Sequence, residues 1–164
     1  MGLIEKGEGL AELLNRGGIF RNIQGSTPRE VLSALTGALK APHLSAEILL
    51  ETMLEREALM PTGIGRGVAL PHPRNPLIKS ESDQFAVLAF LERPVNWNSL
   101  DGEPVDTLFI IVSASAKGHL RVMSEVTFFC REEGFCRLLE ERASLGDFLA
   151  YISDAEERWA TGRG

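Results

Sequence analysis

Imidazole side chains are the groups of this sequence best suited to chemistry near neutral pH, because imidazole can serve there as nucleophile, base or hydrogen-bond donor. His72 stands between Pro71 and Pro73, whose rings stiffen the backbone on both sides. It follows the apolar run Val68–Leu70, which is typical of a short strand. Loops at strand ends are favoured positions for binding and catalysis. His72 is therefore the first candidate for function, and the alternative is a partly buried histidine in a turn.

A second histidine, His119, follows Gly118 near the expected start of a helix that comes directly after a buried strand. Such a junction in an α/β domain opens toward the ligand crevice, and a helix N-terminus favours anions. Alone, His119 could equally be a cap or surface residue. With His72 it predicts one anion-handling site at neighbouring strand ends. The third histidine, His43, lies in a helix–helix connection, and we interpret it as an exposed loop residue.

Three arginines, Arg56, Arg66 and Arg74, lie within twenty residues of His72 in the sequence. The planar guanidinium group is suited to phosphate or carboxylate. Arg56 has glutamates around it on the same expected helix, so a solvated residue paired with them is the alternative reading for that position.

The turn that precedes His72 is rich in glycine. Gly65 and Gly67 allow left-handed backbone and the close approach of a partner. The turn is neither a Walker loop nor a dinucleotide-binding fingerprint, so it indicates a site only in combination with His72.

The two cysteines, Cys130 and Cys136, have neither CxxC nor zinc spacing. We interpret them as reduced apolar residues of helices, and a disulfide or redox switch is the alternative. No ligand spacing supports a metal site, and no cofactor is predicted. Trp97, in a loop, and Trp159, near the C-terminus, are interpreted as packing residues rather than stacking platforms.

The composition is that of a globular domain: 164 residues, 44% hydrophobic and 24% charged. A formal net charge of −6 weighs against a nucleic-acid-binding protein, which normally carries a basic stripe. The apolar runs are too short to span a bilayer, so no membrane insertion is expected. Residues 1–10 lack an apolar signal-peptide core. We therefore expect a cytoplasmic protein.

Periodicity predicts helices toward both ends of the chain and strands in its middle. The clearest helix start is at Thr27, where Pro28 and Glu30 complete a capping box with a helix-starting proline. Residues 61–67 are expected to be a turn and 93–103 a loop. The expected helices are 9–14, 28–39, 45–59, 118–131, 134–143 and 145–152, and the expected strands are 19–23, 68–70, 85–91 and 105–113.

This order of elements predicts an α/β fold: a single domain with a mixed β-sheet flanked by helices. No repeat or low-complexity linker divides the chain. The domain is expected to occupy residues 1–153, followed by a polar C-terminal tail over 154–164.

The segment Pro61–His72 resembles the signature of the enzyme IIA domains of the bacterial phosphoenolpyruvate-dependent phosphotransferase system. The class is the fructose/mannitol class, which includes the nitrogen-regulatory IIA proteins. The family's motif histidine falls on His72, its upstream arginine on Arg56 and its second histidine on His119. The similarity extends over about residues 10–152 and includes Leu13–Ile19, Leu54–Leu59 and Val95–Asp106.

The resemblance implies the fold named above and a role in phosphoryl transfer. It implies that His72 receives a phosphoryl group from the phosphohistidine of the small carrier HPr, or of its nitrogen-branch counterpart. The group then passes to a IIB domain or remains as a regulatory mark. His119 would lie beside His72, and Arg56 would support the site. Because no IIB or transporter segment is fused here, the nitrogen-regulatory kind is favoured.

Three positions differ from the pattern of the family. Pro73 and Arg74 stand where the family usually has glycine and then lysine or threonine, and Arg66 stands where a small or amide residue is common. Pro73 removes a backbone N–H. We predict that Gly65, Arg66, Gly67 and Arg74 bind phosphate or the partner protein. The altered positions also motivate a second hypothesis, a regulatory protein-binding module that retains the fold and acts by docking without transfer.

Overall fold

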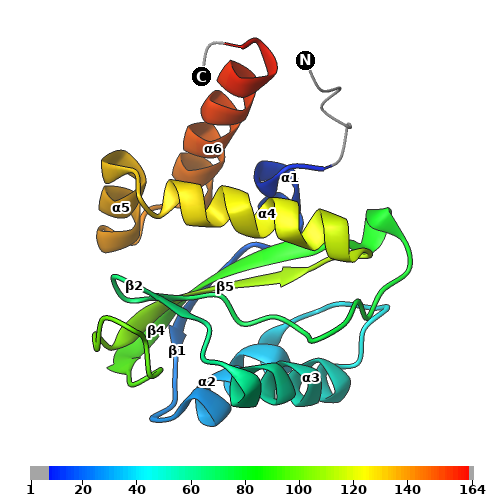
Figure 1. Ribbon diagram of the computed structural model, residues 1–164, viewed down its shortest axis with the longest axis vertical. Helices are drawn as coiled ribbons and strands as arrows, with labels where there is room; N and C mark the ends of the chain where they lie inside the picture. The colour runs from blue at the N-terminus through cyan, green and yellow to red at the C-terminus, as the bar shows by residue number, and fades with distance from the viewer. Residues whose placement is uncertain (1–7, 163–164) are drawn as a thin grey trace.

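The computed structural model describes residues 8–162, in which a mixed five-stranded sheet lies between two layers of helices (Figure 1). This is the architecture that the order of elements predicts. The prediction about a signal peptide rests mainly on residues 1–7, which lie outside the described residues. No helix within residues 8–162 is long and apolar enough to cross a membrane.

The two longest strands, β4 (Phe85–Val95) and β5 (Val105–Val112), form an antiparallel pair in the interior of the sheet. Both are buried between helical layers, which explains their nearly continuous apolar sequences. The sheet order is β1-β4-β5-β3-β2, with β1 (Ile19–Ile23) parallel to β4 and β3 (Val68–Ala69) parallel to β5. Ala69 pairs with Leu108, so the chain leaves β3 toward the end of the sheet at which β5 terminates.

Each face of the sheet has its own apolar core, because side chains alternate between the two faces along a strand. On β4, Leu88 and Phe90 contribute to one core, and Val87 and Ala89 to the other. Figure 1 shows the helical layer over each face. The first face carries α1 (Leu10–Gly17), α4 (Ala116–Phe129), α5 (Glu133–Glu140) and α6 (Leu145–Ala160), and the second carries α2 (Pro28–Ala38) and α3 (Ala46–Leu59).

The predicted capping box begins α2. Thr27 Oγ1 accepts a hydrogen bond from the Glu30 amide at 3.2 Å, and Pro28 occupies the first turn. In a standard capping box the Glu30 carboxylate would accept from the amide of the cap residue, Thr27. Here it accepts from the amide of Ser26, one residue earlier, at 2.7 Å. Both bonds satisfy amides near the helix start.

The glycine-rich turn was incompletely predicted, because residues 61–67 also contain a strand. β2 (Gly63–Gly65) pairs with β3 in an antiparallel hairpin. The hairpin turns through Arg66, at φ 56°, and Gly67, at φ 80°. A strand built mainly from glycine carries no alternation of apolar and polar side chains, and for that reason periodicity missed it.

Three elements run longer than the sequence predicts, and the first of them is α1, which continues beyond Leu14 to Gly17. β4 continues beyond Leu91 to Val95, which pairs with Val105 across the sheet. α6 continues to Ala160, so the expected polar tail begins inside this helix. The physical reason is packing: Ala155 is buried, and Trp159 packs against the aromatic side chains of α4.

Candidate functional site

His72 emerges three residues after β3, in the segment that leaves the sheet beside the end of β5. Its Nδ1 lies 2.8 Å from the carbonyl oxygen of Leu70. A carbonyl can only accept, so Nδ1 carries the proton and donates. In the neutral ring this leaves the lone pair on Nε2. The backbone hydrogen bond therefore leaves Nε2 of His72 as the ring nitrogen with an available lone pair.

The pKa of His72 is lowered, mainly because the half-buried ring loses solvation of its charged form. The hydrogen bond to Leu70 opposes this shift, the positive charge of Arg56 adds to it, and the negative charge of Glu57 opposes it. The net direction keeps the imidazole neutral near pH 7. A neutral ring is the form that can attack phosphorus.

His119 lies in the first turn of α4, and its ring meets that of His72 with 4.7 Å between centroids. Burial lowers the pKa of His119 to about 4, with the charges of His72 and Arg56 acting in the same direction. Its Nε2 is buried and has no hydrogen-bond partner among the described residues. Buried polar atoms are nearly always satisfied, so this nitrogen, like the other buried atoms without a partner, needs an explanation.

Arg56 reaches the same site from the last turn of α3. Its guanidinium donates to the carbonyl oxygen of Met60 at 2.7 Å, and its positive charge acts on both imidazoles. The bond to Met60 replaces the pairing with neighbouring glutamates that the sequence left open as the alternative. His72, His119 and Arg56, which come from three separate elements, therefore share one site.

Glu57 is a residue of the site that sequence reasoning considered only as a possible partner of Arg56. Its carboxylate accepts hydrogen bonds from the amide and the hydroxyl of Thr62, the former at 3.1 Å. These bonds tie the end of α3 to the start of the β2–β3 hairpin. Glu57 also lies near enough to His72 to act on its pKa. Only the presence of a hydroxyl residue five positions later could have signalled this contact.

The family model for "Phosphoenolpyruvate-dependent sugar phosphotransferase system, EIIA 2" matches residues 12–155. The chain belongs to this EIIA family. Among curated relatives, the nitrogen regulatory protein of Pseudomonas aeruginosa is 34% identical over 71% of this chain and 77% of that protein. The nitrogen regulatory protein of Escherichia coli is 32% identical over 77% of each chain.

Solved structures agree with this EIIA assignment. The nitrogen regulatory protein IIA-Ntr of Neisseria meningitidis superposes with a TM-score of 0.70 at 26% identity, covering 82% of this chain and 92% of that one. Mannitol IIA of Escherichia coli, in a complex with phosphorylated mannitol IIB, gives a TM-score of 0.64 at 19% identity, covering 83% and 94%. The latter shows the same fold.

The remaining candidates of the EIIA domain lie around the β2–β3 hairpin. Gly65 and Gly67 have positive φ angles of 96° and 80°, and a Cβ on either would come within 3.1 Å of an aspartate oxygen. The amide of Arg66 donates to Asp101 at 2.9 Å, and Arg74 is exposed. None of these residues is among the groups that shift the pKa of His72 or His119. Their assignment to phosphate or partner binding stays a prediction.

The Arg66 side chain borders a cavity of about 430 Å³, lined also by Cys130 and Cys136. Both cysteines are free thiols. Burial raises the pKa of Cys130 to about 12, and the Cys136 thiol donates to the Cys130 carbonyl at 3.0 Å. Residues 8–162 contain no cluster of three or more histidine, cysteine, aspartate or glutamate side chains that could hold a metal ion. Trp97, 1% exposed, is a packing residue as predicted.

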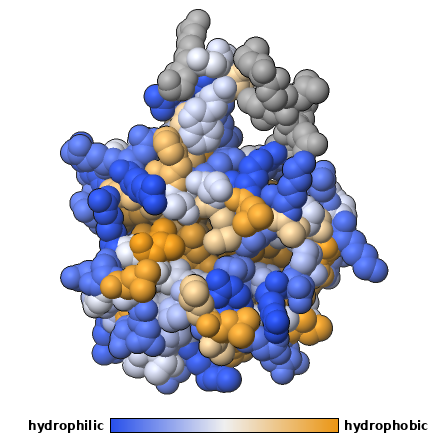
Figure 2. Space-filling model, viewed as in Figure 1, coloured by the Kyte–Doolittle hydropathy of each residue, from blue (hydrophilic) through white to orange (hydrophobic). Residues whose placement is uncertain are grey.

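Exposed apolar side chains flank the site. Leu59 and Met60 follow Arg56 at the end of α3, and Leu120 follows His119 on α4; all three are more than 60% exposed. Figure 2 shows apolar side chains gathered among polar ones on the face that carries α3 and α4. A reactive pair bordered by such residues is suited to contact with another protein.

Proposed function

We propose that this chain is a cytoplasmic phosphoryl carrier of a phosphoenolpyruvate-dependent phosphotransferase system, of the nitrogen-regulatory kind, with His72 as the covalent acceptor. One observation carries the proposal. Nε2 of His72 has its lone pair free, because Nδ1 donates to Leu70, and the adjacent ring of His119 keeps a buried, unpartnered Nε2. A phosphoryl group on His72 would satisfy that atom.

The proposed transfer of the phosphoryl group needs no metal or cofactor. Nε2 of His72 attacks the phosphorus of a phosphohistidine on an HPr-like carrier, in line with the breaking P–N bond. The electron pair of that bond returns to the carrier's imidazole. The proton of His72 stays on Nδ1, which continues to donate to the Leu70 carbonyl, and the product ring carries the positive charge. Arg56 offsets the charge on the equatorial phosphoryl oxygens, and His119 supplies a hydrogen bond to one of them.

The proposed partners are the HPr-like carrier and, downstream, a IIB domain or a regulatory target protein. The apolar side chains of Leu59, Met60 and Leu120 border the histidine pair and would contact the carrier. Arg66 and Arg74 would meet acidic groups at the rim of this contact. A neighbouring structure is a complex of mannitol IIA with phosphorylated mannitol IIB, which supports a IIB domain as one class of partner.

Pro73 motivates a second candidate function. This buried residue follows the acceptor histidine directly and has no amide hydrogen to offer a phosphoryl oxygen. In the second function the chain docks onto a regulatory target without carrying phosphate.

One experiment separates the two functions. The protein is incubated with phosphoenolpyruvate, enzyme I and the cognate carrier, and intact mass is measured before and after mild acid. We expect one acid-labile phosphoryl group on the wild type and on His43→Ala, a matched control at an exposed histidine, and none on His72→Ala. An unlabelled wild type beside a charged carrier would favour the docking function. Label that persists in His72→Ala would refute the site.

A further inference from the structure

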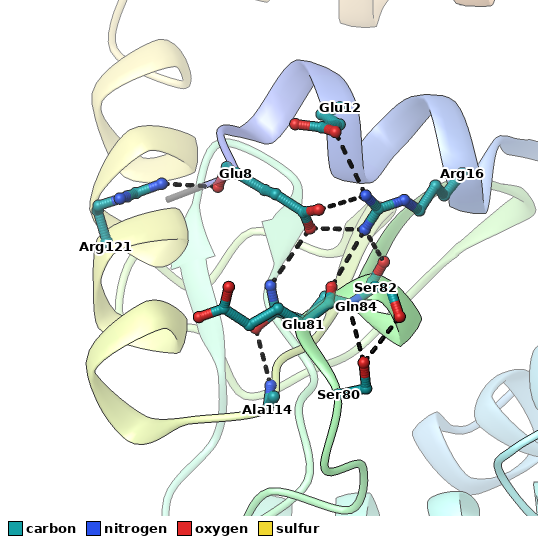
Figure 3. Close-up of polar contacts among 9 residues, drawn as sticks. All are labelled: Glu8, Glu12, Arg16, Ser80, Glu81, Ser82, Gln84, Ala114 and Arg121. Atoms are coloured by element: carbon teal, nitrogen blue, oxygen red, sulfur yellow. Dashed lines mark hydrogen bonds and ion pairs between the residues drawn. The ribbon is translucent and has the colours of Figure 1, made fainter. Parts of the chain in front are cut away.

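Gln84, the residue before β4, is a buried amide whose two ends bond to different parts of the chain (Figure 3). Its side-chain oxygen accepts from the amide of Ala114 at 2.9 Å, and its Nε2 donates to the carboxylate of Glu8 at 3.4 Å. Gln84 is only 7% exposed. A buried amide satisfied at both ends holds a fixed orientation.

The Glu8 end of this connection is itself anchored. Its carboxylate pairs with the guanidinium of Arg16 on α1, which lowers the pKa of Glu8. Arg16 also donates to the backbone carbonyl of Gln84 at 2.9 Å, and Arg121 of α4 donates to the carbonyl of Glu8 at 2.7 Å. Glu8, Arg16 and Gln84 therefore form one network, which we call the Gln84 network, joining α1, β4 and α4 (Figure 3).

The Ala114 end of the connection lies beside the candidate site. Ser113 and Ala114 separate β5 from Ser115, the N-cap of α4, and Ser115 Oγ accepts from the amide of Gly118 at 3.1 Å. A Cβ built on Gly118 would lie 3.7 Å from the side-chain oxygen of Gln84. The Gln84 amide thus sits against the first turn of α4, directly before His119.

We propose that Gln84, held in place by Glu8 and Arg16, is a positioning residue that fixes the first turn of α4 and thereby the His119 imidazole against His72. The expected change in transfer rate rests on the proposed function. The expected change in the position of the His119 ring rests on geometry alone. His119 Nε2 has no hydrogen-bond partner among the described residues, so the backbone of this turn and the contact with the His72 ring set where the imidazole lies.

The test compares wild type with Gln84→Met, which keeps the length of the side chain and removes both hydrogen bonds. Gln24→Met, at an exposed glutamine, is the matched control.

The His119 pKa and the hydrogen exchange of the Ala114 amide are measured by NMR, and phosphoryl transfer from a charged carrier is measured by rapid mixing. In Gln84→Met we expect faster exchange at Ala114 and a His119 pKa shifted upward as the turn opens to water. Misplacing a positioned group slows transfer, here on the order of tenfold in kcat with KM for the carrier unchanged.

The double variant Glu8→Gln/Gln84→Glu exchanges the two side chains. The carboxylate at position 84 can still accept from the Ala114 amide, and the side-chain amide at position 8 can donate to that carboxylate. It should recover the wild-type His119 pKa and most of the transfer rate. If Gln84→Met does not fold, Glu8→Ala, which removes the carboxylate that accepts from Gln84 and Arg16, takes its place and should produce the same changes at smaller size.

A Gln84→Met protein that loses stability but keeps the wild-type His119 pKa and transfer rate would overturn the proposal, because Gln84 would then serve the fold alone. Wild-type protein that takes no phosphoryl group from a charged carrier would refute the proposed function instead. In that case the NMR measurements on His119 and Ala114 still decide the positioning role.

Discussion

Two pairs of like titratable groups meet at helix α4, and burial shifts them in opposite directions. His119, in the first turn, meets His72, and burial lowers the pKa of both rings. Glu125, further along the helix, meets Glu156 of α6, and burial together with a hydrogen bond and the charge of Glu156 raises the pKa of Glu125 to about 7. Burial favours the neutral form of His72, His119 and Glu125 alike, because it penalises charge whatever its sign.

The pairs differ in what their polar atoms contact. Glu125 and Glu156 accept hydrogen bonds from the amides of Leu10 and Ala11, each at 3.2 Å, and so cap the N-terminus of α1. Nε2 of His119 is buried without a partner. The glutamate pair completes the fold by satisfying amides that would otherwise be orphaned. The histidine pair keeps a buried nitrogen without a partner beside a ring nitrogen with an available lone pair, as the proposed phosphoryl acceptor would.

The largest expected effect is on the rate of phosphoryl transfer, which should depend on the histidine pair and not on the glutamate pair. His119→Gln should slow phosphoryl transfer to His72 on the order of a hundredfold, because it removes a group placed to stabilise charge in the transition state. Glu125→Gln, on the same helix but outside the site, should leave the rate within about twofold. Single-turnover transfer from a charged carrier measures both. Equal losses in the two variants would mean that α4 stability, and not the His119 imidazole, limits transfer.

A smaller effect is expected at Arg56. Arg56→Lys keeps the charge but loses the planar fork that can hold two phosphoryl oxygens, so kcat should fall about tenfold. The bond to Met60 can be kept by an ammonium group, and the unfolding midpoint in urea should therefore change little. A rate equal to that of wild type would show that charge alone is sufficient at this position.

The two pairs should also oppose each other in the pH dependence of stability. Glu125 has a raised pKa, so its contribution is fully present below about pH 4.5 and is lost as the pH rises through about 7. His119 has a lowered pKa, so its contribution is present above about pH 6.5 and is lost as the pH falls through about 4. Between these limits the two slopes offset each other in the wild type.

Removing one pair at a time should reveal the slope of the other. The thermal midpoint of the double variant His72→Gln/His119→Gln should fall as the pH rises from about 5 to 7, and that of Glu125→Gln should rise over the same interval. Thermal unfolding followed by circular dichroism in matched buffers measures both. Variants that keep the pH profile of the wild type would show that neither pair carries the assigned shift.

The smallest effect is expected at the exposed arginines outside both pairs. Arg66→Gln and Arg74→Gln should each raise KM for the carrier about twofold without changing kcat, because charges at the rim of an interface act mainly on association. The increase should disappear at high salt. A change in kcat in either variant would place that arginine at the phosphoryl group.

Local signals in the sequence predicted much of the fold. Thr27 and Glu30 placed the start of α2, and uninterrupted apolar runs placed β4 and β5. β2 was missed because its glycines carry no pattern. The end of α6 was missed because the polar segment after Ile152 is held by Ala155 and Trp159, which pack in the aromatic core.

The site divides in the same way. The family resemblance predicted a site of His72, Arg56 and His119, and the structure brings these three residues together, whereas the place of Glu57 and Gln84 was not predicted. Gln84 bonds to residues 30 and 76 positions away, and no periodicity records contacts at such separations. Figure 3 shows the connection that only folding creates.

The sequence by itself determined most of the helices and strands, their order, and the chemical types available to the site, because these depend on neighbours a few residues apart. Only the tertiary structure decided that the rings of His72 and His119 meet, that burial holds both neutral, and that one nitrogen is left without a partner. Desolvation and hydrogen-bond satisfaction are properties of the packed surroundings, and distant segments supply those surroundings.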